Sequence, residues 1–186
     1  MSFASVVDQV AVYLGGPYDA TTRTYRVAPA GGTQVPGLAL VRRSWAKRED
    51  FADFFAGAAV GAATGAWMTV WVPDKIERRL TVPAVTGRKH VRYLVELHCF
   101  VFSKAAYAED CSDFVDALDA AVIARIRADP TLGTGGFEAG QIQAGEPDEH
   151  GMGGDIHSQR WQMSTDDQVT KAKLEISFEA HAIDVG

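Results

Sequence analysis

The apolar residues between Arg88 and Pro130 change their spacing once, and this change predicts a strand followed by a helix. In the segment Arg88–Ser103, alternate positions form one apolar face at the two-residue period of a β-strand: Val91, Tyr93, Val95, Leu97, Cys99 and Val101. In the segment Asp110–Ala128, apolar residues recur at helical spacing, with Asp113, Asp116 and Asp119 between them. Pro130 marks the end of this helix. We expect part of a sheet covered by a helix.

Both ends of the chain carry equally regular patterns. Ser2 is a good helix cap, and an apolar stripe from Phe3 to Leu14 follows it until Gly15-Gly16-Pro17 ends the helix. From Lys171 to Ala182 the even positions are apolar and face a core, while the odd positions, including His181, face water. One wet face is typical of an antiparallel sheet.

The middle of the chain predicts further strands and several long loops. Strands are expected at 22–28, 38–43, 66–72, 137–143 and 155–163, and the segment 66–72 is apolar on both faces, which indicates a buried or covered strand. Pro73 and Pro83 bracket a charged hairpin arm or loop, 144–154 reads as a mobile acidic loop, and 47–59 is ambiguous. The order helix, strands, helix, strands predicts an α+β fold, a mostly antiparallel sheet with two main helices packed on one face and long loops or arms.

The length and composition predict one domain, 1–186, with flexible or partner-ordered loops at 45–65, 73–87 and 144–154. The chain has 186 residues, of which 47% are hydrophobic, and no apolar run is long enough for a membrane helix. The N-terminus has neither the basic region nor the small-residue cleavage site of a signal peptide, so we expect none. Residues 1–105 hold 13 Lys+Arg and 8 Asp+Glu, whereas residues 106–186 hold 5 and 16. This layout can steer head-to-tail self-association, although such halves more often only solvate their own surfaces. The overall negative charge argues against binding to nucleic acid.

No motif in the sequence predicts catalysis, a cofactor or a metal. The segment Gly133–Gly136 follows a helix instead of a strand, so it reads as a turn, and no serine stands in a Gly-x-Ser-x-Gly elbow. The acidic and histidine residues from Asp148 to His157 match no zinc or calcium loop. Two cysteines, Cys99 and Cys111, lie on elements that can be close in space; we favour reduced thiols and leave their pairing open.

Three segments resemble the tail terminator proteins of long-tailed bacteriophages, which are small α+β subunits. These segments are the helix Phe3–Leu14, the passage "VELHCFVFSKAAYAEDCSDFVDALDAAVIARIRADPTL" and the closing strand "KLEISFEAHAI". The resemblance implies a homohexameric ring at the head–tail junction of the virion, made in the host cytoplasm and without enzymatic activity. Its partners would be the tail-tube protein and a neck or head-completion protein, with no membrane and no sequence-specific nucleic acid. The segments 45–65 and 75–83 depart from the family's short pattern.

The charge layout and the resemblance together suggest which residues form subunit contacts. We expect basic residues of one subunit to face the acidic half of the next, with aromatic residues as anchors. The candidate interface residues are Arg42, Arg43, Trp45, Phe54, Phe55, Arg78, Arg79, Asp113, Asp116 and Asp119. Two other functions stay open: a neck or head-completion subunit, and a small enzyme or metal-binding domain that uses the segment His150–His157.

Overall fold

Two helices and a mostly antiparallel sheet make up the part of the chain that the computed structural model describes, which confirms the α+β prediction. The described residues are 1–27, 33–43, 64–80, 87–135, 142–148, 151–166 and 169–185. The elements in chain order are α1 (Phe3–Gly15), β1 (Tyr18–Asp19), β2 (Thr24–Tyr25), β3 (Leu38–Arg43), β4 (Thr64–Arg79), β5 (Arg88–Ser103), α3 (Ala108–Ala128), β6 (Ile142–Ala144), β7 (Glu146–Asp148), β8 (Gly151–Gly153), β9 (Ile156–Asp166) and β10 (Val169–Val185).

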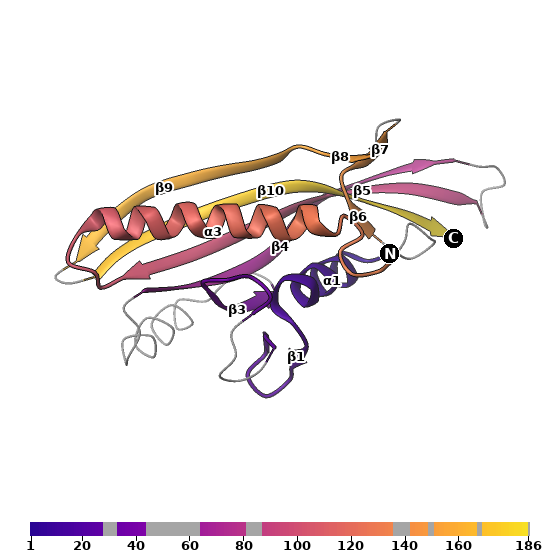
Figure 1. Cartoon of the computed structure of the whole chain (residues 1–186). Coiled ribbons are helices and arrows are strands. Elements are labelled where there is room, and N and C mark those ends of the chain that lie inside the picture. Colours follow the sequence, from indigo (N-terminus) through magenta and orange to yellow (C-terminus); the bar gives the residue numbers. More distant parts are fainter. Residues whose placement is uncertain are drawn as a thin grey trace.

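The long strand β5 lies in the middle of the sheet between β4 and β10. The strand order is β1-β2-β3-β4-β5-β10-β6, and β9 also pairs with β10. Strand β10 pairs with β5 along its whole length, from Val185 opposite Arg88 to Thr170 opposite Ser103. Strand β3 runs parallel to β4, and the other pairs are antiparallel. Figure 1 shows the far ends of β4, β5 and β10 extending beyond the helices.

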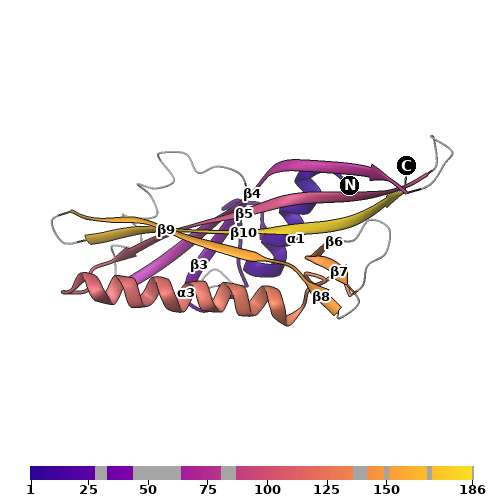
Figure 2. The same ribbon diagram turned by 90° about the horizontal axis from the view of Figure 1, so that it is seen from above.

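Both helices pack on the same face of the sheet. The ring of Tyr93 on β5 lies 6.2 Å from the ring of Phe3 in an edge-to-face arrangement, and the Tyr93 hydroxyl donates a hydrogen bond to the Met1 carbonyl at 2.9 Å. Helix α1 also contacts α3, because the Tyr13 hydroxyl donates to the carbonyl of Arg125 at 2.6 Å. Figure 2 shows α3 lying along the sheet. The even residues of β10 from Ala172 to Ala182 are buried in this core, as predicted.

The helix ends follow the local sequence. The Ser5 amide donates to the Ser2 hydroxyl and the Ser2 amide donates to the Ser5 hydroxyl, so the predicted cap is present as a reciprocal pair. Helix α3 begins at Ala108, two residues before the predicted start, and ends at Ala128. Its first residue is preceded by Tyr107, whose side chain makes no capping bond. Neither described helix is long and apolar enough to span a membrane.

The predicted end of the strand at Val72 is wrong, because β4 continues through Pro73 to Arg79. Its register against β5 shifts between Trp71 and Asp74. Such a bulge leaves one residue without a ladder hydrogen bond, so a proline can stand there without breaking the strand. The segment after Pro73 is therefore a strand of a hairpin arm, one of the two alternatives that the sequence left open.

Three smaller predictions also need correction. The segment 144–154 is not simply a loop, because β7 and β8 pair as a small ribbon within it. The strand predicted at 22–28 is only Thr24–Tyr25, which pairs with the unpredicted β1. His181, predicted to face water, is 1% exposed because its ring stacks on His90 of β5. Of the strand predicted at 137–143, only the end is described, as the start of β6; the segment 47–59 lies outside the described residues.

Candidate functional site

A charged arm projects from one end of the sheet. We define the arm as residues 74–80, which are the last part of β4 and the residue after it, together with residues 88–92 at the start of β5. The Leu80 amide donates to the Arg88 carbonyl at 2.9 Å, which continues the hairpin pairing to this point. Ile76 and Leu80 are 48% and 50% exposed. The residues in the first half of β4, by contrast, are mostly apolar and buried. The arm therefore presents both apolar and charged side chains to solvent.

The arm's positive charge is only partly neutralised within the subunit. The Glu77 carboxylate pairs with the Lys75 ammonium and lies 3.7 Å from the Lys89 ammonium. The hydrogen bond and charge of Lys75, with the charge of Lys89, hold the pKa of the Glu77 carboxyl below its usual range. Arg78 and Arg79 are exposed and form no ion pair with any residue that the structure describes. Their register partners on β5 are His90 and Lys89, which are not acidic. Two guanidinium groups are thus available to a partner.

The other basic candidates are placed differently. The Arg43 guanidinium lies 3.2 Å from the Asp8 carboxylate of α1 and 5.4 Å from the centre of the Tyr18 ring, so it holds β3 against α1. Arg42 stands beside Thr69 in the register between β3 and β4. The aromatic candidates Trp45, Phe54 and Phe55 lie outside the described residues.

Two of the three acidic candidates on α3 make contacts within their own subunit. The Asp116 carboxylate pairs with the Arg160 guanidinium, and the Asp119 carboxylate accepts a hydrogen bond from the Ser158 hydroxyl at 2.6 Å. Both partners belong to β9, which the sequence did not place beside α3. Asp113 is exposed on the same helix. The exposed acidic surface is therefore narrower than the sequence suggested.

The start of α3 carries the remaining acidic cluster. Glu109 and Asp110 lie in the first turn of α3, where they complement the positive end of the helix dipole, and Asp113 follows one turn later. All three are exposed, and the preceding Tyr107 is 71% exposed. This cluster follows the last residue of β5, whereas the arm contains its first. A 16-residue strand spans about 50 Å, so the basic and acidic ends of the subunit are far apart.

A polar network lies on the sheet face opposite the two helices. The ring of His98 on β5 lies 3.3 Å from the Glu96 carboxylate and 3.4 Å from the Glu175 carboxylate of β10. Glu175 also accepts hydrogen bonds from the Lys173 ammonium at 3.1 Å and the Trp161 indole at 3.2 Å. Sequence reasoning missed this network because it joins three strands, although strand alternation correctly placed His98 and Cys99 on opposite faces.

Burial and charge set the ionisation of this network. Burial lowers the pKa of His98, the Lys173 charge lowers it further, and the two glutamates oppose them without reversing the direction. Burial alone would raise the pKa of Glu175, but the hydrogen bond and charge of Lys173 bring it below its usual range. At neutral pH the network therefore holds a neutral His98 imidazole beside an ionised Glu175 carboxylate.

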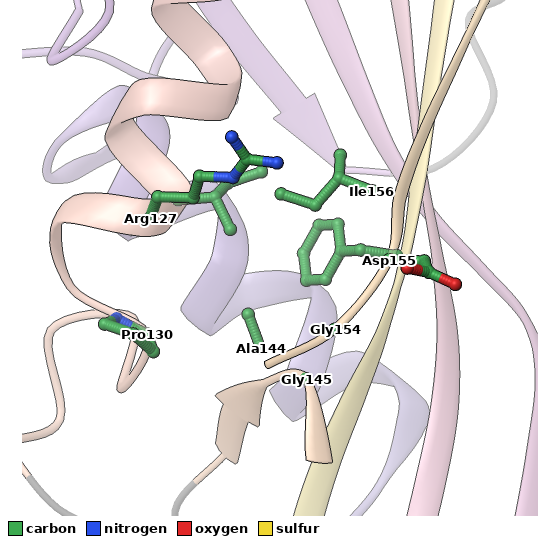
Figure 3. Close-up of a pocket in the computed structure, with 9 residues that line it drawn as sticks. Arg127, Pro130, Ala144, Gly145, Gly154, Asp155 and Ile156 are labelled. Atoms are coloured by element: carbon green, nitrogen blue, oxygen red, sulfur yellow. The ribbon is translucent and has the colours of Figure 1, made fainter. Parts of the chain in front are cut away.

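Two cavities meet where β6 and β9 abut along β10. Strand β9 pairs with β10 as far as Phe178 opposite Ile156, and β6 takes over at Ala180 opposite Ala144. Between them the Gly145 amide donates to the Glu179 carbonyl at 2.8 Å. A cavity of about 360 Å³ lies on the side of α3, and one of about 550 Å³ lies against Leu94, Ser177 and His181. Figure 3 shows the cavity beside α3, with Arg127, Ala144 and Ile156 at its margin.

The side chains that could ligate a metal or act as thiols are dispersed or buried in the part of the chain that the structure describes. Among the described residues, no cluster of three or more His, Cys, Asp or Glu side chains is placed to hold a metal ion. Cys99 and Cys111 are both buried free thiols, and burial raises the pKa of each. The chain matches no protein-family model and no curated protein.

Proposed function

We propose that this chain is a structural subunit that assembles head to tail into a closed ring, as expected of a tail terminator that caps a phage tail tube. The observation that carries the proposal is the separation of charge along one long strand. Arg78 and Arg79 are exposed beside the start of β5, and Glu109, Asp110 and Asp113 are exposed beyond its end.

These two charged ends are too far apart to neutralise each other within one subunit. The screening length at physiological ionic strength is about 8 Å, much less than the length of β5. A neighbouring subunit that brings its acidic end to the arm would satisfy both ends at once. Because the two surfaces differ, the contact is heterologous, and such contacts form a ring when the rotation between subunits closes.

The exposed apolar residues of the arm support the same role. Ile76 and Leu80 are about half exposed next to the two arginines, and an interface commonly combines an apolar centre with a charged rim. In a ring, the proposed partners above and below would be a neck or head-completion protein and the tail-tube protein.

Oligomeric state tests the proposal directly. We expect native mass spectrometry and sedimentation of the full chain to give a closed ring, and we expect Arg78→Glu and Arg79→Glu each to shift it toward monomers. Arg23→Glu is the matched control, because Arg23 is also exposed and lies outside the arm. Adding Asp110→Arg and Asp113→Arg to the arm variants should restore assembly.

Two outcomes would contradict the proposal. One is a wild-type chain that stays monomeric over a wide range of concentration and salt. The other is a ring that survives both arm reversals at low and high salt, because the charged arm would then not be part of the contact. A tail-terminator role further predicts that the ring stops the growth of purified tail-tube subunits of the same phage, as measured by tube length in negative-stain electron microscopy.

A further inference from the structure

The cavity beside α3 has a backbone floor and apolar walls. Gly145 and Gly154 approach so closely that a Cβ atom on Gly154 would lie 2.5 Å from the Cα of Gly145. Neither residue can contribute a side chain to fill the space. The walls come from the last turn of α3, from β6 and from the paired ends of β9 and β10, and they include Ile126, Ala144 and Phe178.

One cation stands at the margin of this cavity. In Figure 3 the guanidinium of Arg127 extends from the helix over the cavity toward Ile156, while the Asp155 carboxylate points away from it. Arg127 forms no ion pair or hydrogen bond with any residue within the described ranges. The neighbouring arginines differ, because Arg125 stacks on the Tyr13 ring at 4.1 Å and Arg160 pairs with Asp116.

We propose that this cavity binds a small carboxylate with a short apolar tail. The planar guanidinium of Arg127 matches the two oxygens of a carboxylate, and the walls match an aliphatic or small aromatic tail. The volume, about 360 Å³, lies at the lower end of the range for ligand pockets, roughly 300 to 1,000 Å³, which favours a small ligand. Binding at this site does not require ring assembly, so the two proposals can fail separately.

The exposure of Arg127 fixes how the two parts of the ligand contribute. Ion pairs with solvent-exposed side chains are weak, so the carboxylate mainly orients the ligand, and burial of the tail supplies most of the affinity. We therefore expect weak binding that grows with the length of the tail until the cavity is full. Loss of the guanidinium should weaken binding by roughly two- to fivefold, the range for a favourable exposed charge pair.

The test uses the full chain and three probes: hexanoate, its neutral analogue hexanamide, and acetate, which has the charge without the tail. We expect saturable shifts of the NMR signals of Ala144 and Ile156 with hexanoate at millimolar concentration, weaker binding of hexanamide, and none of acetate. Arg127→Gln should bring hexanoate down to the level of hexanamide, and Arg23→Gln, which removes an exposed arginine elsewhere, should not. Ala144→Phe, which fills the cavity, should abolish binding of both.

Three results would overturn the proposal. They are the absence of saturable shifts at tens of millimolar hexanoate, equal binding of hexanoate to wild type and Arg127→Gln, and binding that survives in a folded Ala144→Phe protein. If Ala144→Phe fails to fold, the comparison of Arg127→Gln with Arg23→Gln decides alone, because both change only exposed side chains. Native mass spectra of the same samples report ring assembly independently.

Discussion

The contact between Tyr13 and Arg125 gives a quantitative test of how the two helices pack. Tyr13 is buried on α1, and its hydroxyl donates to the carbonyl of Arg125 at 2.6 Å, while its ring stacks under the Arg125 guanidinium at 4.1 Å. Burial raises the pKa of the Tyr13 hydroxyl, so it stays a donor across the neutral range. Tyr13→Phe removes only the hydrogen bond, because the ring and its stacking remain.

We expect Tyr13→Phe to lower the free energy of unfolding by about 1 to 1.5 kcal/mol, the net value of one hydrogen bond whose acceptor loses its partner. For a chain of this length that corresponds to a fall in melting temperature of about 2 to 6 °C. Tyr13→Ala also empties a large buried site and should cost about 3 to 5 kcal/mol. Urea denaturation followed by circular dichroism gives each value.

A double-mutant cycle separates the two parts of the contact. The hydroxyl bonds to a backbone carbonyl, so the effects of Tyr13→Phe and Arg125→Met should add to within about 0.5 kcal/mol. Tyr13→Leu removes the ring, and its effect should couple with Arg125→Met by about 0.5 to 2 kcal/mol, the value of a cation–π contact. A Tyr13→Phe protein as stable as the wild type would refute the packing of α1 against α3 described above.

Three further predictions concern other parts of the fold. Because burial lowers the pKa of His98 in the folded chain, the free energy of unfolding should fall as the pH drops below about 6.5, the usual histidine pKa, and His98→Gln should flatten that fall in urea titrations at several pH values; an unchanged slope would contradict the assignment. Gly154→Ala should destabilise the chain by about 1 to 3 kcal/mol, because the new Cβ meets the backbone of Gly145, and hydrogen exchange should show faster opening of β6 and β9. Ser2→Ala should cost about 0.5 to 2 kcal/mol by removing the cap of α1, whereas Ser2→Asp should retain most of the stability.

The elements that sequence predicts well are those whose signals lie within one segment. The strand Arg88–Ser103 has the predicted bounds, because its apolar alternation continues without interruption and one face is fully buried. Helix α1 begins after Ser2 as predicted, because the cap and the apolar stripe are both local. Strand β3 also has the predicted bounds, Leu38–Arg43.

The features that the sequence does not predict depend on pairing between distant segments. Pro73 normally argues for the end of a strand, but β5 provides a partner on which β4 can bulge and continue. His181 alternates as a water-facing residue and becomes buried because its nitrogen lies 2.9 Å from that of His90, 91 positions earlier in the chain. No periodicity within β10 contains that information.

The candidate sites, too, depend on contacts between segments that are distant in the sequence. The cavity beside α3 exists because β6 and β9, separated in sequence by a ribbon, meet end to end along β10, and its cation comes from a third element. A count of arginines could not distinguish Arg127 from Arg125, which is two residues away on a different side of the same helix and already stacked. The sequence could identify the charged residues, but not which of them are already engaged.

That distinction changes where an assembly contact would form. From sequence, the acidic half of the chain is a broad surface, but Asp116 and Asp119 bind β9, and the Asp129 carboxylate accepts hydrogen bonds from Thr131 and Gly133 in the turn after α3. On the basic side Arg43 is held by Asp8, whereas Arg78 and Arg79 of the arm form no ion pair with any described residue. Of the described interface candidates, Arg78 and Arg79 beside the start of β5 and Asp113 beyond its end are thus left for a neighbour. A head-to-tail contact between such small, distant patches fixes one orientation of the next subunit, which a ring of identical subunits requires.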